Sequence, residues 1–374
     1  MERKHQYRSG LTSVSVSDPE IDSVSTGLAG EETGPERLAR RLGDIVLTGM
    51  GTLAPNELVL AETALVDLLP YLSPALKRRF AERIAPLETA PGVLLRALLD
   101  EPFDVAEPIL ADGQGLTNCD LIRVADRGTP AHRLCIAGRL QVSRAVCDAL
   151  VEKGEIGVFN RLLANTGADL SHASLELMVR RSSAEPDLIA ALLRRAELTP
   201  WFAHMMFWWA DGEERATILK RFSIDRRAIL EALADTVDLE CLVGEGAAAL
   251  QSTYRMLRQA HKTSDAEWEH LWGALGDEAS QAALAEAADI SPAAAAWIVS
   301  DEGGEPLAIL GKALGLSRQA FRELAARISA ARISGAYTEN ELERATALFD
   351  SVTMERADSI LHLWDRIISS ETQG

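Results

Sequence analysis

The pattern of apolar and polar residues changes once along the chain, near residue 35. Residues 1–34 are rich in Ser, Thr, Gly, Asp and Glu and show no apolar period, which predicts a disordered N-terminal tail. From Pro35 onward apolar residues recur at helical spacing. No later stretch has the alternation of a strand, so the chain is predicted to be all-α. The period is clearest in Leu316, Ala320, Phe321, Leu324, Ala325 and Ile328.

Helix start signals recur at short intervals. A hydroxyl residue before a proline can cap a helix, and the proline suits the first helical position because its missing N–H costs nothing there. The spacing predicts short helices with short joints, and short joints make neighbouring helices antiparallel. The Ser/Thr-Pro pairs are Ser73-Pro74, Thr129-Pro130, Thr199-Pro200 and Ser291-Pro292, and the pairs with capping-box spacing are Ser264 with Glu267 and Thr338 with Glu341.

A weak internal repeat accompanies these signals. The segment 125–128 recurs at 151–154, and at the same shift Leu110 aligns with Ile136 and Leu162. One helix pair cannot bury its apolar face alone, so the repeat predicts an α-solenoid of stacked short antiparallel helix pairs. Polar residues near the turns are expected to bond backbone groups of the neighbouring pair; these residues are Asp148, Asn165 and Arg139.

Several segments carry a family resemblance. Residues 98–106 resemble the turn between HEAT repeats, and the runs 134–143, 158–165, 207–210 and 218–222 follow in an order similar to that of a bacterial domain-of-unknown-function family with HEAT-like helical repeats. The resemblance covers roughly residues 40 to 330. It implies an α-solenoid, and it implies no reaction and no cofactor.

Charge divides the chain further. The net charge is −18, and residues 231–310 hold 15 acidic side chains against three basic ones. We therefore predict a HEAT-like repeat region over 35–230 and an acidic C-terminal helical region over 231–374. Such an acidic surface repels phosphate backbones, which argues against nucleic acid as a partner. Basic residues in the first half could still form a stripe: Lys77, Arg78, Arg79, Arg180, Arg194 and Arg195.

The cysteines and the hydropathy point to the cytoplasm. None of the four cysteines forms a Cys-x-x-Cys pair, and all are interpreted as small buried apolar residues in a reducing compartment. No apolar run reaches the length of a membrane span, and the N-terminus lacks the pattern of a secretory signal, so no membrane insertion is expected. The cysteines are Cys119, Cys135, Cys147 and Cys241.

Motifs that carry chemistry are absent from the sequence. No two of the seven histidines have the spacing of a helical metal site, and Gly303-Gly304 completes no phosphate-binding pattern. Carboxylates in the acidic region lack calcium-loop spacing and are interpreted as a solvated face. The sequence predicts no catalytic residue, no metal ligand and no cofactor.

The densest feature is the aromatic run 201–209, which holds three of the seven tryptophans. On a helix Trp201, Met205 and Trp208 share one face, and Trp209 lies on the adjacent one. The favoured interpretation is a helix sandwiched between layers, because Trp is usually largely buried. The functional alternative is an exposed patch that binds a partner through Trp201, Met205, Trp208 and Trp209.

Three functional hypotheses follow. The first is a non-enzymatic adaptor or regulatory scaffold that binds another protein through a solenoid face, with a homo-oligomer as a further option. The second is an enzyme whose site is assembled from scattered side chains in the solenoid groove. The third is a nucleic-acid-binding HEAT-like protein, which requires the basic residues of the first half to form a continuous stripe.

Overall fold

The computed structural model describes residues 33–48, 54–222, 278–331 and 337–372. The chain divides into two compact units, residues 1–77 and 78–374. Within the described residues every regular element is a helix, and Val142 and Ala168 form an isolated β-bridge. The prediction of an all-α fold is confirmed. The predicted tail, apart from its last two residues, and the predicted boundary near residue 230 lie outside the described residues.

The first unit is a small helical assembly. Helix α1 (Gly34–Thr48) packs on α2 (Pro55–Leu68), which continues into the 3-10 turn η1 (Leu69–Tyr71). Helix α1 buries only Ala39, Gly43 and Val46, a stripe of small side chains at helical spacing. The carboxylate of Glu36 accepts a hydrogen bond from the backbone N–H of Ser73 at 3.3 Å, which ties the start of α1 to the end of this unit.

The second unit begins inside α3 (Pro74–Ile84) and continues through a run of short helices. Prolines begin three of the helices where predicted before residue 222, at positions 74, 130 and 200. The other helices of this run are α4 (Gly92–Leu99), α5 (Phe103–Asp112), α6 (Asn118–Arg127), α7 (Pro130–Ala137), α8 (Arg144–Glu152), α9 (Ile156–Ala164), α10 (His172–Arg181), α11 (Asp187–Arg194), α12 (Pro200–Met206) and α13 (Gly212–Arg221).

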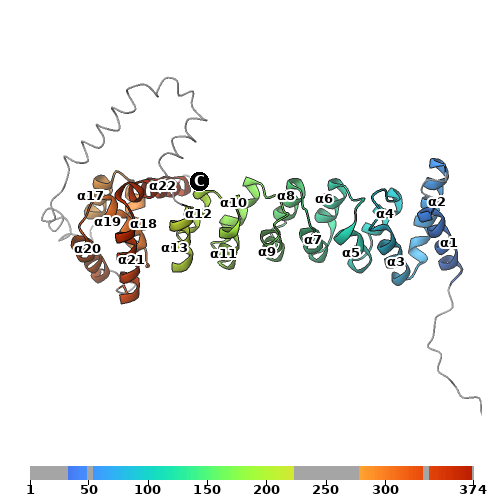
Figure 1. Cartoon of the computed structure of the whole chain (residues 1–374), viewed down its shortest axis with the longest axis horizontal. Coiled ribbons are helices and arrows are strands. Elements are labelled where there is room, and N and C mark those ends of the chain that lie inside the picture. The colour runs from blue at the N-terminus through green and yellow to red at the C-terminus, as the bar shows by residue number, and fades with distance from the viewer. Residues whose placement is uncertain (1–32, 49–53, 223–277, 332–336, 373–374) are drawn as a thin grey trace, which may run out of the picture. The chain divides into compact units, whose positions relative to one another are not determined.

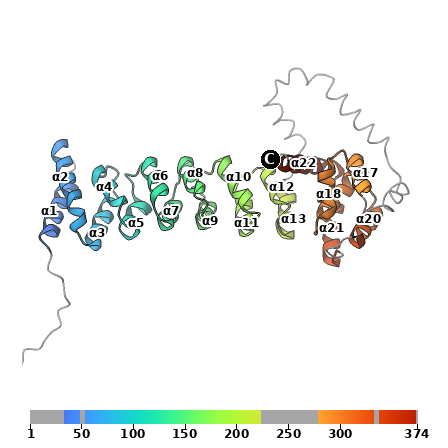
Figure 2. The ribbon, with the colours of Figure 1, turned by 180° about the vertical axis from the view of Figure 1, so that it is seen from behind.

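From α5 to α13 each helix packs against the helix two places further along the chain. The odd helices contact one another in the order α5, α7, α9, α11 and α13, and the even ones in the order α6, α8, α10 and α12. Figures 1 and 2 show these two rows side by side from opposite directions. The aligned apolar residues Leu110, Ile136 and Leu162 are all fully buried. These three side chains therefore belong to the buried core of the second unit.

A ladder of side chains joins successive odd helices. From α7 to α13, a side-chain donor at the end of each odd helix, or just beyond it, bonds to carbonyls at or just after the end of the preceding odd helix. A helix end leaves such carbonyls without a partner and carries partial negative charge, so cationic and amide donors are favourable there. The donors and acceptors are Arg139 with Leu110, Ala111 and Gly113, Asn165 with Ala137 and Arg139, Arg195 with Asn165 and Ala168, and Arg221 with Leu193 and Arg195.

The even row has a comparable tie. Both oxygen–oxygen distances from Asp148 Oδ1 to the hydroxyls of Ser171 and Ser174 are 2.6 Å, so the carboxylate of α8 holds the start of α10. The predicted bonding to backbone groups of the neighbouring pair is confirmed for Asn165 and Arg139, whereas Asp148 bonds to side-chain hydroxyls of the neighbouring pair instead. Each of these side chains bonds to a neighbouring pair rather than pointing into an open site.

Removing one rung of the ladder is expected to destabilise the second unit measurably. Asn165→Ala removes bonds of 3.0 and 2.7 Å to two carbonyls and one of 2.9 Å from the Gly167 N–H. At about 0.5–1.5 kcal/mol for each bond, we expect a loss of about 2–4 kcal/mol in the free energy of unfolding, measured by urea denaturation. The same substitution at exposed Asn160, within α9, is the control and should change stability by less than about 0.5 kcal/mol. Equal effects of the two changes would refute the role of the rung.

The C-terminal helices of the second unit surround a buried central helix. Helix α19 (Glu305–Ala313) buries every residue except Lys312 and contacts α18, α20, α21 and α22. The predicted caps Ser291 and Thr338 accept backbone N–H groups at the starts of α18 and α21, whereas Ser264 lies outside the described residues. The surrounding helices are α17 (Glu278–Ala288), α18 (Pro292–Ser300), α20 (Arg318–Ala331), α21 (Glu339–Ser351) and α22 (Met354–Thr372).

Helix α22 links these helices to the stack. It contacts α12, the last even helix before residue 222, and its Arg356 donates to the carbonyl of Leu219 near the end of α13. The ladder of the odd row therefore ends on a residue from the C-terminal helices. The contacts between α12, α13 and α22, together with α18 and α19, define the junction described next.

Candidate functional site

The aromatic run forms the core of the junction. Thr199 caps α12, and the buried side chains of the run include Phe202, Met205 and Phe207. Trp201, Trp208 and Trp209 are half-buried, and the Trp209 indole N–H donates to the Ser182 hydroxyl at 2.9 Å. The run therefore packs mainly between helices, which agrees with the favoured interpretation. Among the predicted partner-binding residues, Met205 faces the interior and the three tryptophans keep part of their surface.

His204 is fully buried in this core. Its Nδ1 lies 3.1 Å from the Trp364 indole nitrogen, and its Nε2 lies 3.0 Å from the carbonyl oxygen of Phe222. Since an indole N–H can only donate and a carbonyl can only accept, these contacts fix a neutral imidazole with its proton on Nε2. Burial lowers the pKa of His204 from 6.5 to about 4. The side chain is a structural bridge between α12 and α22.

A tryptophan from the turn after α12 meets tryptophans from α18 and α22 beside His204. The ring of Trp208 lies 5.3 Å from the Trp364 ring and 5.3 Å from the Trp297 ring, both in edge-to-face geometry. Trp364 is fully buried, whereas Trp297 on α18 keeps 41% of its surface exposed. The indole nitrogen of Trp208 is buried and has no hydrogen-bond partner in the described structure. The cluster thus has a buried side and a solvent-facing side, the latter formed by Trp297 and the exposed part of Trp208.

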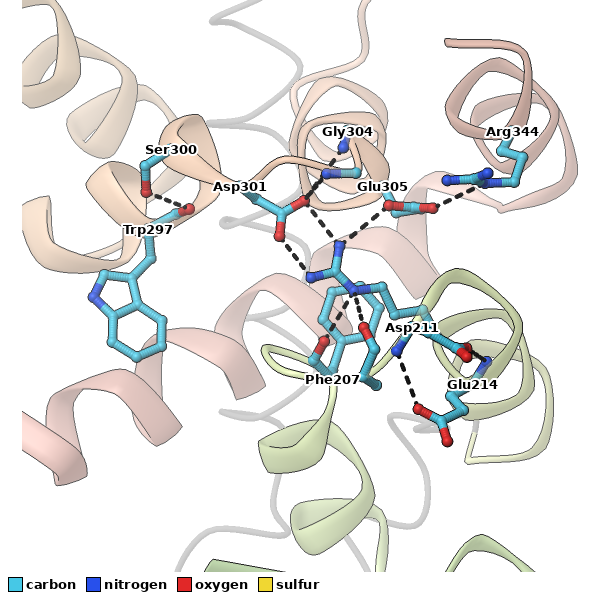
Figure 3. A network of polar contacts seen from close by, with 12 residues as sticks. Phe207, Asp211, Glu214, Trp297, Ser300, Asp301, Gly304, Glu305 and Arg344 are labelled. Atoms are coloured by element: carbon cyan, nitrogen blue, oxygen red, sulfur yellow. Dashed lines mark hydrogen bonds and ion pairs between the residues drawn. The ribbon is translucent and has the colours of Figure 1, made fainter. Parts of the chain in front are cut away.

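A charged centre closes the junction next to this cluster (Figure 3). The Arg215 guanidinium of α13 binds both carboxylate oxygens of Asp301, at 2.9 and 2.7 Å, and lies 3.3 Å from Glu305. Its Nε donates to the carbonyls of Phe207 and Ala210, each at 3.1 Å. All three charged side chains are buried, with exposed fractions of 10%, 6% and 7% for Arg215, Asp301 and Glu305. We call these three side chains the Arg215 centre.

The Gly303-Gly304 turn gives the Arg215 centre its shape. The Asp301 carboxylate also accepts the backbone N–H groups of Gly303 and Gly304, at 2.9 and 3.2 Å. A Cβ on Gly303 would lie 2.0 Å from a Glu305 carboxylate oxygen, and Gly304 has a φ of +78°, which favours glycine. The glycine pair therefore serves close packing around two carboxylates. It is preceded by α18, so it lacks the strand that a phosphate loop follows.

The chemistry of the Arg215 centre suits a structural role, in which buried ion pairs hold two turns together. Burial lowers the pKa of Arg215, but the hydrogen bonds and charges of Asp301 and Glu305 outweigh it and hold that pKa above its ordinary value. A permanently charged guanidinium whose Nε and terminal nitrogens are engaged transfers no proton. Arg344 approaches the other Glu305 oxygen at 3.5 Å. The centre therefore fastens the turn after α12 to the turn before α19.

Sequence reasoning missed most of this site. It singled out the aromatic run and kept His204 in view, but it did not identify Arg215, Asp301, Glu305, Trp297 or Trp364 as partners. The Arg215 centre joins residues 86 and 90 positions apart, and His204 and Trp364 are 160 apart. The one local signal was the glycine pair between two carboxylates, which a phosphate-loop pattern does not match.

The described cysteines differ in their exposure to solvent. Burial raises the pKa of Cys135 to about 11 and that of Cys147 to about 12, which keeps both as thiols. Cys119 is exposed, so the prediction that all cysteines are buried is wrong there, because it lies in the first turn of α6 on the solvent side. Cys241 lies outside the described residues. No three His, Cys, Asp or Glu side chains of the described chain gather into a metal-binding group.

The basic residues of the first half are partly engaged within the second unit. Arg78 forms ion pairs with Glu82 and Glu107, and Arg180 pairs with Glu176. Arg195 is buried on the ladder.

Among the described helices, none has both the length and the apolar composition needed to cross a bilayer.

Comparison with known proteins places the chain in a family. No curated protein and no solved structure matches it. A family model described as an uncharacterised protein conserved in bacteria, DUF2336, matches residues 105–362. The match begins within α5, includes the Arg215 centre and ends within α22, so it starts later than the resemblance seen in the sequence, near residue 40, and reaches past that resemblance's end near residue 330. The chain therefore belongs to the DUF2336 family of uncharacterised bacterial proteins.

Proposed function

We propose that this chain is a non-enzymatic adaptor or regulatory scaffold in the cytoplasm, and that its stacked helices form a HEAT-like α-solenoid. The partner is another protein, which docks on the solvent-facing side of the tryptophan cluster. The observation that carries the proposal is Trp297, which is 41% exposed while its ring is held edge-on against Trp208. Aromatic side chains fixed in this way lose little entropy on binding, and Trp is enriched in binding hot spots.

One further feature, the charge of the surrounding helices, specifies the partner. Residues 278–374 carry 15 acidic and 8 basic side chains, which favours a partner segment with basic residues around an apolar anchor. We therefore place the centre of the proposed partner-binding patch at Trp297 and Trp208, instead of at the four residues of the aromatic run.

The alternatives receive less support from the same contacts. An enzyme site needs groups that are free to bind substrate or move protons, whereas Arg215 and His204 are saturated by internal bonds. A nucleic-acid surface needs free cations, whereas Arg78, Arg180 and Arg195 are engaged by carboxylates or carbonyls.

Quantitative affinity purification with matched variants tests the proposal. Tagged wild type, Trp297→Glu and Leu140→Glu chains are used as baits in lysate of the native host, and captured proteins are quantified by mass spectrometry. Leu140 is 89% exposed and lies in the stack, after α7, so it serves as the control. We expect a stoichiometric protein that Trp297→Glu reduces at least about tenfold, as for loss of a hot spot, and that Leu140→Glu retains.

Two outcomes would contradict the proposal. One is a set of captured proteins that does not differ between Trp297→Glu and Leu140→Glu. The other is the absence of any stoichiometric protein with the wild type. Because Trp297 also contacts Trp208, thermal melts of both variants establish that a lost partner does not reflect unfolding, and Trp297→Ala provides a second variant without a new charge.

A further inference from the structure

Apolar side chains are exposed along both helices of the first unit. On α1, Leu38 and Ile45 are 51% and 46% exposed, and half-buried Leu42 lies between them at helical spacing. On α2, Leu60 is 71% exposed and lies one turn before half-buried Ala64. We call these two rows the α1 stripe and the α2 stripe. Isolated exposed apolar residues are ordinary, but rows of them on adjacent helices mark an interaction surface.

Helix α1 contributes few large side chains to the interior of this unit. The residues that α1 buries are Ala39, Gly43 and Val46, so its larger side chains, Leu38 and Ile45, remain at the surface. A helix hairpin normally buries its apolar face against further helices. A second hairpin of the same kind would supply them.

Charge indicates which hairpin fits. Helix α1 holds three exposed arginines, at positions 37, 40 and 41, and one exposed aspartate, Asp44, and Arg41 follows Leu38 of the α1 stripe by three residues. Helix α2 contains Glu57, Glu62 and Asp67 and no basic residue, and exposed Asp67 lies two turns after Leu60 in the α2 stripe. The exposed charges of α1 are therefore mainly basic, and those of α2 are acidic. Pairing α1 with α1 would oppose mainly like charges, whereas pairing α1 with α2 brings opposite charges together.

We propose that the chain forms a homodimer through its first unit, in which the α1 stripe of each copy packs on the α2 stripe of the other. In a two-fold interface each contact occurs twice, so Arg37 and Arg41 of each copy meet the Asp67 side of its partner. The four helices then form a bundle that covers Leu38, Ile45 and Leu60 in both copies. This inference uses only the first unit and is independent of the proposed tryptophan surface.

The mass of the full chain in solution tests the dimer. Size-exclusion chromatography with light scattering is expected to give twice the chain mass of 40.5 kDa, with dissociation on dilution. Leu38→Lys combined with Leu60→Lys is expected to give a monomer, because it places cations in the apolar interface. Both side chains are exposed within one chain, so the variant should keep its helical circular dichroism. Leu140→Lys, at an exposed leucine of the second unit, should remain dimeric.

Exchanging the charges at positions 41 and 67 distinguishes the proposed α1–α2 pairing from non-specific hydrophobic association. Arg41→Glu is expected to raise the dissociation constant of the dimer at least about tenfold, and adding Asp67→Arg to Arg41→Glu should restore it to within about threefold. A wild-type chain that is monomeric at every concentration would overturn the proposal, as would a dimer that survives the double lysine variant. A photo-crosslinker at Leu60 that links to residues 1–32 of the same chain would assign the stripe to that segment instead. Failure of charge rescue would refute the α1–α2 pairing.

Discussion

Replacement of Arg215 by Met is expected to lower the free energy of unfolding of the second unit by about 3–5 kcal/mol. The change leaves Asp301 and Glu305 buried without the guanidinium that binds both of them. It also removes the donor to two backbone carbonyls. Methionine fills a similar volume, so the loss reflects stranded charge more than a cavity. Urea denaturation followed by tryptophan emission measures it, since Trp208 and Trp364 lie at the junction.

Two further variants separate this explanation from general damage. Arg318→Met breaks an ion pair with Asp350 on the surface, where Arg318 is 63% exposed, and should cost less than about 1 kcal/mol. Adding Asp301→Asn and Glu305→Gln to Arg215→Met removes the stranded charges, while the new amide oxygen at position 301 can still accept the glycine N–H groups. This combination should recover a substantial part of the loss. Equal losses in the free energy of unfolding for Arg215→Met and Arg318→Met would refute the proposed structural role of the Arg215 centre.

Acidification should destabilise the junction through His204. Its pKa is about 4 in the folded chain and 6.5 when exposed, so the unfolded chain binds more protons between these values. Stability is therefore complete above pH 6.5 and falls as the pH drops toward 4. At about 1.36 kcal/mol per pKa unit the contribution of His204 amounts to about 3 kcal/mol. Protonation also puts a donor on Nδ1, where the Trp364 N–H already points.

A glutamine at position 204 isolates this contribution. Its amide offers an acceptor and a donor but does not titrate between pH 4 and 7. Unfolding free energies measured across this range should fall about 3 kcal/mol further for the wild type than for His204→Gln, whereas other titrating groups affect both chains alike. Parallel pH profiles of the two chains would show that His204 is not the responsible group.

Local features of the fold could be predicted from the sequence because each depends on neighbouring residues. A capping hydroxyl acts on an N–H three residues away, so Thr338 and the Ser291-Pro292 pair marked real helix starts. The repeat placed Leu110, Ile136 and Leu162 in one buried row. It did not show that Arg139 and Asn165 are equivalent rungs, because two residue types bond to the same kind of carbonyl group there.

The junction could not be predicted, because its contacts join distant parts of the chain. Any of the carboxylates between residues 231 and 310 could have paired with a buried arginine, and nothing in the sequence favours Asp301 and Glu305. The breadth of the aromatic run suggested more than one neighbouring helix. That the neighbour is α22, and that Trp297 remains partly exposed, depends on three-dimensional packing alone.

The ladder also sets an order of events during synthesis. The carbonyls at the end of each odd helix from α5 to α11 bind a side chain that leaves the ribosome 26–30 positions later, or roughly 1–6 s later at about 5–20 residues per second. The Leu219 carbonyl of α13 instead waits for Arg356, 137 positions on, which takes roughly 7–27 s. Among the odd helices from α5 to α13, the end of α13 is therefore accessible to chaperones and proteases for the longest time during translation.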